Sequence, residues 1–510
     1  MTLIVMGRRR GTIPTVPISL TLSRQDGGSG STLVNTGIPL AQGELLPGNV
    51  GNCSLWINGS EVACYLEALR GTHADGSVQW LLVQWTGNPA TVSSCELRIN
   101  GGSSVGRATK VTPPRVPSTY FVAPVSRLTG APRKPFKTVP VGSSALPSWL
   151  SQWDNLYADR IAFERTQSST YQKWENRLGG GAPYDFGATC IKYGMRSANA
   201  LYWHHALTTG QDLTTNSQSY SWVSSNVLEF SVVETWSWVW CYWLTGNTDY
   251  IQALAFHTRR MVDMNGGNGQ LPAGTASDSN TGPGDNRLPA RALDGYVASI
   301  HLGVTTGEFG TSEFWVGANW TANSSGMAQF VTDIFTIVTT AGRWGGTVYT
   351  ESAAPNRIGQ KPFMVGMLLS ALARHDDLFG DSRTNTKIPQ SITVLRTDDW
   401  SATPPTTSGQ PSFSYVTYDV NSTNARWDTD TGSAGGDNIH GLNNFHVAYM
   451  LRQSRIAADT ELRSFVQTFV NACYANRNEW INQSPGFATK QFDEAYVYLF
   501  EAQREFVESA

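Results

Sequence analysis

The sequence has few charged residues. Asp, Glu, Lys and Arg make up 15% of its 510 residues, whereas an average globular domain has about 25%. The net charge is -3 at pH 7. The one basic run is Arg8-Arg9-Arg10, so no surface suited to a phosphate backbone is expected. This composition argues against nucleic acid as a partner.

Paired cysteines and nucleotide-binding motifs are also missing. The six cysteines show no Cys-x-x-Cys pair and no spacing typical of zinc, which favours buried free thiols over a disulfide framework. There is no Walker loop, dinucleotide fingerprint or Gly-x-Ser-x-Gly motif. Asp428 to Gly432 has the oxygen spacing of a calcium loop but lacks the bidentate Glu, so a turn is favoured. We expect no cofactor, with calcium as a weak alternative.

Long apolar runs are absent. The longest, around residues 239–244, is far shorter than the ~20 residues that span a bilayer. At the N-terminus the apolar run is short and precedes the basic residues, the reverse of a secretory signal. We therefore expect synthesis in the cytoplasm, no signal peptide and no membrane partner.

Aromatic residues, in contrast, are abundant: 18 Trp, 18 Tyr and 20 Phe. Most buried aromatic rings fill cores, and this is the commoner role of any single Trp. Their flat faces also stack on the apolar faces of sugar rings. Many Trp combined with little charge favours a carbohydrate-binding protein.

The pattern along the chain predicts an α+β multidomain protein. Residues 1–112 alternate apolar and polar side chains between turn signals such as Asn58-Gly59 and Asp75-Gly76, which indicates an all-β barrel or sandwich. Residues 113–150 form a proline-rich connection or a set of edge strands. Eight of the 24 prolines fall there: Pro113, Pro114, Pro117, Pro124, Pro132, Pro135, Pro140 and Pro147.

Residues 151–510 have helical periodicity. Several expected helices end in Thr-Gly, at Gly210, Gly246 and Gly307, where a left-handed residue would close the last turn. Such repeated helical hairpins form an open solenoid or a closed (α/α) toroid, and long polar loops, including an insertion at 391–441, favour the toroid. The expected helices are 191–208, 226–244, 250–264, 293–304, 326–341, 363–378, 445–455, 460–475 and 492–508.

A family likeness accompanies these patterns. The segments Gly37-Ile38-Pro39-Leu40-Ala41-Gln42-Gly43 and Asp75-Gly76-Ser77-Val78-Gln79-Trp80 resemble elements of the exo-acting rhamnogalacturonan lyase (YetA-like) family. Arg291-Ala292-Leu293-Asp294-Gly295-Tyr296, followed by Thr306-Gly307, is similar to a helix of that family, although many toroids share this pattern. The likeness touches both parts of the chain but is patchy. It implies a β-barrel-like domain, an (α/α) toroid and a polysaccharide substrate.

The chemistry of such a lyase directs the search for catalytic residues. A base, usually Tyr, His or Lys, takes the C5 proton of a uronate whose carboxylate is neutralised by a cation or amide. Tyr184 lies in a Gly-rich loop before a helix, next to Asp185, which either binds substrate or caps that helix. His440 and His446 flank Asn443 at another helix start. These are candidates for base and carboxylate neutraliser, with helix capping by Asn443 an equal alternative.

The remaining candidates lie in and before the helices. Glu234 lies in an expected, strongly aromatic helix with Trp236, a candidate substrate contact whose spacing to Trp240 and Trp243 is also typical of a core face. An unpaired carboxylate in such a helix would be costly outside a cleft. Charged residues near two loops either hold a uronate or form loop salt bridges: Arg287, Arg291, Asp294, Arg357 and Lys361.

The function expected from these residues is polysaccharide binding by a lyase-like, carbohydrate-active protein. If it is active, we expect a polysaccharide lyase or depolymerase rather than a glycoside hydrolase, which needs two carboxylates. The alternative is a non-catalytic bacteriophage virion protein, an adhesin of the tail or capsid that keeps the toroid to grip glycan. Its partners would include other virion proteins or a second copy of the chain. Whether the protein cuts or only grips the glycan stays open from the sequence.

Overall fold

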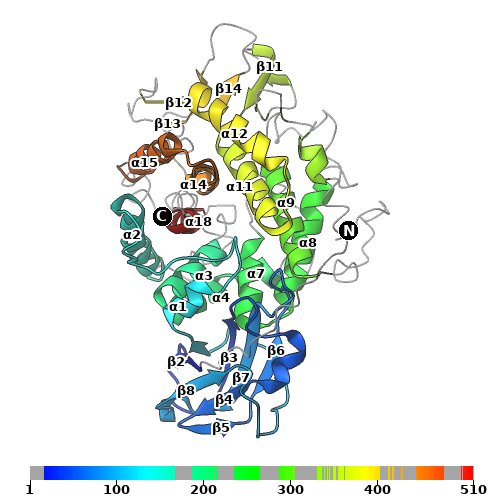
Figure 1. The fold of residues 1–510 in the computed structure, drawn as a ribbon, viewed down its shortest axis with the longest axis vertical. Coiled ribbons are helices and arrows are strands. Elements are labelled where there is room, and N and C mark those ends of the chain that lie inside the picture. The colour runs from blue at the N-terminus through cyan, green and yellow to red at the C-terminus, as the bar shows by residue number, and fades with distance from the viewer. Residues whose placement is uncertain are drawn as a thin grey trace, which may run out of the picture. The chain divides into compact units, whose positions relative to one another are not determined.

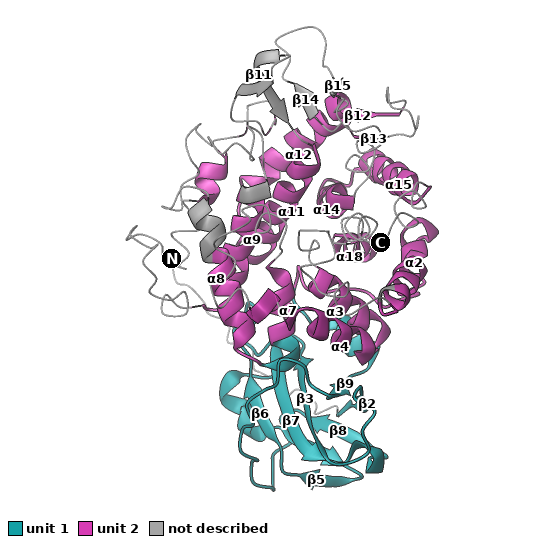
Figure 2. Ribbon diagram, turned by 180° about the vertical axis from the view of Figure 1, so that it is seen from behind, with its two compact units in different colours: residues 1–133, 243–246 teal, residues 134–242, 247–510 magenta. Residues whose placement is uncertain are grey.

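The computed structural model shows a β-sheet region followed by a helical region, so the protein is α+β overall (Figure 1). It divides into two compact units (Figure 2). The β unit comprises Met1–Arg133 and Trp243–Gly246, and the helical unit comprises Lys134–Tyr242 and Asn247–Ala510. The residues that the structure describes are 17–166, 186–211, 213–215, 235–264, 287–304, 330–335, 338, 342, 344, 348–351, 354–360, 362–402, 412–413, 416–418, 427–428, 444–475, 496 and 498–508.

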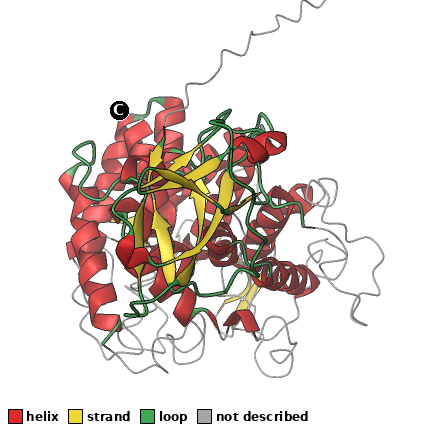
Figure 3. Ribbon diagram, turned by 90° about the horizontal axis from the view of Figure 1, so that it is seen from below, coloured by secondary structure: helices red, strands yellow, loops and turns green. Residues whose placement is uncertain are grey.

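Between residues 17 and 133 the β unit contains two sheets (Figure 3). One has the order β1-β8-β4-β5, formed by β1 (Ile18–Ser19), β8 (Cys95–Arg98), β4 (Ser54–Ile57) and β5 (Ser60–Val62). The other has the order β2-β9-β3-β7-β6, formed by β2 (Thr21–Arg24), β9 (Thr119–Val122), β3 (Thr32–Pro39), β7 (Trp80–Gly87) and β6 (Tyr65–Ala68). Short helices η1 (Pro47–Asn52), η2 (Pro89–Thr91) and α1 (Val125–Gly130) complete the unit.

The β3–β7 pair organises the larger sheet. It is antiparallel from Thr32↔Gly87 to Pro39↔Trp80, and the side chains of Val34 and Ile38 are fully buried. The predicted Asn58-Gly59 hairpin joins β4 to β5, with both residues in the left-handed region at φ 51° and 78°. All six cysteines are free and buried, as the sequence predicted.

The proline-rich stretch is partly folded. β9 lies between β2 and β3 rather than at the sheet edge, and α1 follows it. The units divide between Arg133 and Lys134. The sequence had assigned 113–150 to a connection because prolines dominate its composition, yet the Thr119–Val122 segment between the prolines has free amide groups for sheet pairing.

The helical unit contains longer helices and a few short strands. The helices are α2 (Ser148–Glu164), α3 (Phe186–Ser197), α4 (Ala200–Thr209), α7 (Trp236–Thr245), α8 (Asp249–Met264), α9 (Arg287–His301), α11 (Pro362–Phe379), α12 (Thr384–Val394), η5 (Leu395–Asp399), η6 (Asn444–His446), α14 (Val447–Ala457), α15 (Thr460–Ala475) and α18 (Leu499–Glu508). The strands are β10 (Val348–Glu351), β11 (Ala354–Gln360), β12 (Trp400–Ser401), β13 (Ser412–Phe413), β14 (Val416–Tyr418) and β15 (Trp427–Asp428).

Two details of the helix ends differ from expectation. The expected helix 191–208 is two helices, because Ala198 turns into the left-handed region at φ 49° and Asn199 caps α4 by accepting from the Leu201 amide. Gly246 closes α7 at φ 72°, as predicted, whereas Gly210 stays right-handed at φ -89° because helical turns continue beyond it. After α9 the left-handed residue is Gly303, at φ 59°, ahead of the expected Gly307, which lies outside the described residues.

Candidate functional site

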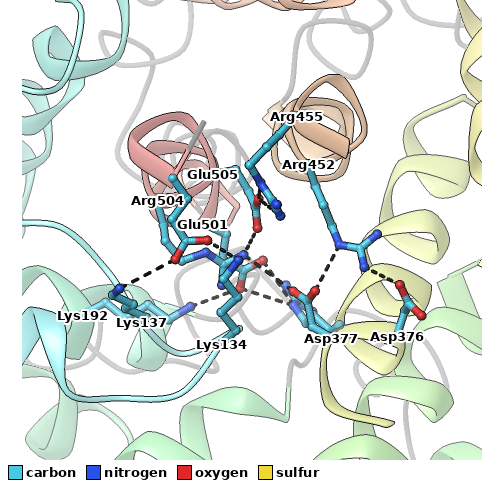
Figure 4. Close-up of polar contacts among 12 residues, drawn as sticks. Lys134, Lys137, Lys192, Asp376, Asp377, Arg452, Arg455, Glu501, Arg504 and Glu505 are labelled. Carbon is cyan, nitrogen blue, oxygen red and sulfur yellow. Dashed lines mark hydrogen bonds and ion pairs between the residues drawn. The ribbon is translucent and has the colours of Figure 1, made fainter. Parts of the chain in front are cut away.

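A cluster of charged side chains gathers inside the helical unit (Figure 4). We call it the central cluster and define it as Lys192 of α3, Asp294 of α9, Arg374 and Asp377 of α11, Arg452 of α14, and Glu501, Arg504 and Glu505 of α18. All are buried except Asp377, which is half-buried. A buried charge is tolerated only with partners, so the pairing within the cluster determines its role.

Arg374 joins two carboxylates. Its Nη1 donates to both oxygens of Asp294 at 2.9 Å, and its Nε donates to Glu501 Oε1 at 3.3 Å. Asp294 also accepts from Trp236 Nε1 at 3.2 Å, and Glu501 accepts from Lys192 Nζ at 3.3 Å. These bonds therefore run from α7 through α9, α11 and α18 to α3.

Arg504 and Glu505 connect α18 to its other neighbours. Glu505 accepts from Nε and Nη2 of Arg455, at 3.0 and 2.9 Å, and from Nη2 of Arg504. Asp377 accepts from Arg452 Nε at 3.1 Å and lies 3.7 Å from Arg504 Nη2. The last turns of α11 and α14 are thus held to α18 by ion pairs.

Burial and ion pairing act on these carboxyl groups in opposite directions. Burial raises the pKa of Glu501 and Glu505, but the cations facing them outweigh it and leave both pKa values below the ordinary range. For Asp377, burial outweighs the attraction of Arg504 and Arg452, and its pKa is raised. At neutral pH the Glu501 and Glu505 carboxylates are therefore charged and bound to their partners.

A small cavity lies beside the central cluster. It is lined by Pro135, Ser370, Ala373, Arg374, Asp377, Ala448, Tyr449, Arg452, Glu501, Arg504 and Glu505. Its volume is about 10 Å³. That is room for one water molecule, whereas a typical small-molecule site measures roughly 300 Å³ or more. The central cluster itself therefore holds helices together and does not admit a sugar.

Contacts link six of the described helices in a closed order: α3, α7, α9, α11, α14, α18 and α3 again. Beyond the bonds above, the Ala188 amide of α3 donates to Ser237 Oγ of α7 at 3.0 Å. In four neighbouring pairs the contacts advance in the same direction along both helices, so those helices run parallel. For α3 and α7 the contacts are Ala188–Ser237 and then Lys192–Trp240, and for α9 and α11 they are Arg291–Met367 and then Asp294–Arg374. For α11 and α14, with η6 before it, they are Gly366–His446 and then Asp377–Arg452. For η6 with α14 against the start of α18 and α18 itself, they are Phe445–Tyr498 and then Arg455–Glu505.

His446, a predicted catalytic base, lies inside an aromatic pocket. Its ring is 4.4 Å from that of Phe413, and its Nδ1 is 2.6 Å from the Tyr449 hydroxyl. Burial lowers the pKa of His446 to about 3. A group that is so weakly basic is a poor general base near neutral pH. The structure therefore corrects the prediction: His446 is a neutral core residue.

Three predicted site residues lie in the core of the helical unit. Arg291 and Asp294 are inside α9, which begins six residues before the expected helix 293–304, and each is 1% exposed. Trp236 is 2% exposed and donates to Asp294, as described above. The local reason is that α9 turns these side chains inward, toward α7 and α11. All three contact protein groups and are closed to a glycan.

The other predicted residues cannot be placed by their side chains. Arg287 and Arg357 are described by their backbone alone, in α9 and β11. The rest lie outside the described residues: Tyr184, Asp185, Glu234, Lys361, His440 and Asn443. Their roles stay predictions.

The sequence reasoning missed most of the central cluster. Arg374 is the clearest case, because it interrupts the apolar helix α11, where a cation is costly unless paired. Lys192 and Glu501 carry the same signal within buried helices. In a sequence with so little charge, a charged residue at an apolar helix position is itself informative.

Two further searches concern the part of the chain that the structure describes. It brings together no three His, Cys, Asp or Glu side chains that could ligate a metal ion. It also contains no helix with the length and apolar character needed to cross a membrane.

Comparison of the chain with protein families, curated proteins and solved structures found no match. The likeness to the rhamnogalacturonan lyases therefore rests on the residues that carry it.

Proposed function

We propose that the helical unit is an (α/α) toroid that binds a polysaccharide at one mouth, and that the β unit is a barrel or sandwich. The closed order of six helices supports this proposal. Four of its neighbouring pairs run parallel, and parallel neighbours that return to the first helix are expected of the inner ring of a toroid. The intervening helices, such as α4, α8, α12 and α15, then return the chain along the outside.

The lengths of the connections support one functional mouth. Where α3, α7, α11 and α14 end, the next helix begins within a few residues, at Ala200, Asp249, Thr384 and Thr460. Many residues of the sequence precede the starts of these inner helices: 167–185 before α3, 216–234 before α7, 265–286 before α9, and 403–443, which include β13, β14 and β15, before η6 and α14. Long connections in compact domains are commonly functional.

One observation carries the proposal: several predicted site residues, other than those buried in the core, lie in the sequence at or shortly before the start of an inner helix. Arg287 is the first residue of α9. The others adjoin or closely precede a helix in sequence: Asp185 before α3, Glu234 before α7, Lys361 before α11 and Asn443 before η6. These candidates, spread over 259 positions from 185 to 443 inclusive, thus lie in the sequence at or shortly before helix starts. We propose that the starts of these helices form one end of the toroid and carry the glycan site.

Lyase chemistry fits this set of residues best. Tyr184 or His440 would take the C5 proton, and Asn443, Arg287 or Lys361 would neutralise the uronate carboxylate. A glycoside hydrolase would need two accessible carboxyl groups about 5–10 Å apart. Asp294 and Glu501 share the Arg374 guanidinium, but their burial excludes that role.

A non-catalytic adhesin, such as a phage virion protein, is the second candidate. It is favoured by a specific observation, namely that the predicted polar groups with described side chains are all buried and bound within the core. These are His446, Arg291 and Asp294. In this form of the proposal the mouth grips the glycan without cutting it.

The decisive experiment combines binding and cleavage. The full chain is run by affinity electrophoresis in gels that contain uronate-rich or neutral polysaccharides, and each mixture is followed by the absorbance of new C4–C5 double bonds. We expect retardation by a uronate-rich polysaccharide. Absorbance that rises with it identifies the lyase, and retardation without absorbance identifies the adhesin. Unchanged mobility with every polysaccharide would contradict both.

Variants then locate the site. For a lyase, Tyr184→Phe or His440→Asn should lower the cleavage rate roughly 100-fold or more while retardation persists. For an adhesin, Arg287→Met together with Lys361→Met should abolish retardation. Lys110→Met is the matched control, because Lys110 is an exposed cation of the β unit and its loss should change neither readout.

A further inference from the structure

A cleft of about 380 Å³ lies on the β unit. Clefts that bind small molecules usually measure roughly 300 to 1,000 Å³, so this one has room for a ligand. Its lining comes from β1, from α1 and from the segments beside them, all within the β unit. The lining residues are Pro17, Ile18, Ser19, Ala41, Pro124, Ser126, Arg127, Gly130 and Ala131.

The edge strand β1 lies along the cleft. The Leu20 amide donates to the Cys95 carbonyl of β8 at 2.8 Å. Hydrogen-bonded residues alternate along an antiparallel pair, so the backbone N–H and C=O of Ser19 point away from β8. They meet no partner among the residues that the structure describes. Because β1 has two residues and follows Pro17, which has no N–H, this edge offers bonds to a small ligand rather than to an added strand.

Helix α1 presents small residues to the cleft. Ser126 and Gly130 are one turn apart, line the cleft and are exposed. A Cβ atom added at Gly130 would meet no atom within 4 Å. On the other side of α1, Leu128 and Thr129 are buried and anchor the helix. The cleft therefore stays open because this face of α1 lacks large side chains.

Arg127 is the charged residue of the described lining. Its Nη1 donates to Oε2 of Glu44, which also accepts from the Ala41 amide at 2.8 Å. Glu44 therefore neutralises the guanidinium without a ligand. Nε and Nη2 of Arg127 donate to no other residue in the described part of the chain. Arg127 thus keeps donors for a neutral oxygen, whereas an anionic ligand would have to compete with Glu44.

We propose that this cleft binds a neutral sugar residue. The hydroxyl groups of Ser19 and Ser126, with the remaining donors of Arg127, bond to the hydroxyl groups of the sugar. The exposed rings of Pro17 and Pro124 offer apolar surface to its C–H groups. A few polar groups within an apolar lining are typical of a small-molecule site. The site belongs to the β unit and does not rest on the glycan site proposed for the helical unit.

Saturation-transfer NMR on the full chain tests the proposal, because it detects weak ligands of large proteins. The probes are three neutral disaccharides, lactose, maltose and cellobiose, with digalacturonate as the acidic comparison. We expect transfer to at least one neutral disaccharide and a weaker signal from digalacturonate. Transfer to none of the neutral disaccharides, or to digalacturonate alone, would overturn the proposal.

Gly130→Leu locates the binding. The new side chain fills the cleft from an open position, so we expect the signal to be lost while the melting temperature does not fall. Gly106→Leu is the matched control, because Gly106 is an exposed glycine of the β unit, outside the cleft and equally open. Arg287→Met with Lys361→Met, in the helical unit, should keep the signal. Loss in that double variant with retention in Gly130→Leu would assign the sugar to the helical unit and refute the cleft.

Arg127→Lys tests the polar contact. Lysine keeps a positive charge for Glu44 but loses the planar fork that carries Nε and Nη2. We expect the neutral disaccharide to bind about 10-fold more weakly, with an unchanged melting temperature. Titration of the transfer signal measures the affinity. Equal affinity in Arg127→Lys and the parent would contradict a sugar bound against Arg127.

Discussion

Some ion pairs of the two units lie in opposite environments. In the β unit, the pairs Arg98–Glu96 and Lys110–Glu67 lie at the surface, with side chains between 35% and 41% exposed. In the helical unit, the side chains of Arg196–Asp154 and Arg374–Asp294 are at most 3% exposed. Ion pairs of similar length therefore differ in their structural role: the exposed pairs lie on the surface of the β unit, and the buried pairs join helices of the helical unit.

The physical difference is desolvation. Exposed ion pairs contribute about 0–1 kcal/mol, because water solvates the separated charges almost as well. A buried pair gains little over apolar packing when it is intact, but breaking it leaves an uncompensated charge. The helical unit should therefore depend on matched partners, and the β unit on its apolar core.

The largest effect should follow from Arg374→Met. This change leaves the buried carboxylates of Asp294 and Glu501 without their shared cation, and we expect a loss of about 3–5 kcal/mol in the free energy of unfolding. Urea denaturation followed by helical circular dichroism measures it. Arg98→Met in the β unit is the matched control, with an expected loss of at most about 1 kcal/mol. Similar losses for both variants would erase the proposed difference between the units.

The second-largest effect should be a difference between the two units in how their stability depends on pH. The pKa values of Glu501 and Glu505 are lowered by their cations against the raising effect of burial, so their stabilisation is present above the unfolded pKa of about 4.3. It is lost as pH falls through the lower folded values. Asp377 opposes this in part, since burial raises its pKa and its protonation favours the folded state.

We therefore expect the helical unit to lose stability steeply as the pH falls below about 4. Denaturation midpoints across pH 3–7 measure this slope. Glu501→Gln should be less stable than the parent at neutral pH and should show a flatter decline in acid. An unchanged acid slope would mean that Glu501 does not drive the transition.

A smaller effect is expected at His446. His446→Phe keeps the ring packing against Phe413 but removes the partner of the buried Tyr449 hydroxyl, which should cost about 1–3 kcal/mol of unfolding free energy. Glycan retardation and any cleavage should keep the parent's pH profile, because His446 titrates near 3. A shifted pH profile of retardation or cleavage in the variant would indicate that His446 takes part in catalysis or binding.

The smallest effect is predicted for Lys110→Met. Its partner Glu67 is exposed and stays hydrated after the change, so the unfolding free energy should fall by no more than about 1 kcal/mol. Raising the salt concentration should shrink even this difference, because salt screens exposed charges. A loss as large as that of Arg374→Met would show that exposure does not govern these pairs.

Local patterns in the sequence predicted several helices well but missed α2 and α12. The expected helices 250–264, 363–378 and 460–475 correspond to α8, α11 and α15 within about one residue at each end, because apolar periodicity and end signals are both local. The break at Ala198 was missed, since a left-handed Ala has no sequence signature. Gly210 was assigned a left-handed turn that the continuing helical turns make unnecessary.

The charged site was much harder to predict. Arg374 binds Asp294 across 80 positions and Glu501 across 127, and no local pattern reveals such pairs. Asp294 and Trp236 were predicted to contact substrate. In the structure both are buried: Trp236 donates to Asp294, which also accepts from Arg374. Burial depends on the whole fold, so the sequence alone did not reveal that His446 lies in the core.

The tight turns after α3, α11 and α14 have a consequence for how this protein can change. Residues such as Ala198, Gly380 and Ala458, at φ 49°, 73° and 51°, fix the backbone there within a residue or two. Insertions at those points would force neighbouring helices apart. The stretches that precede the inner helices in the sequence differ in length, from residues 167–185 to residues 403–443. Under the proposed function, directed evolution of glycan specificity should start from those stretches and leave the tight turns fixed.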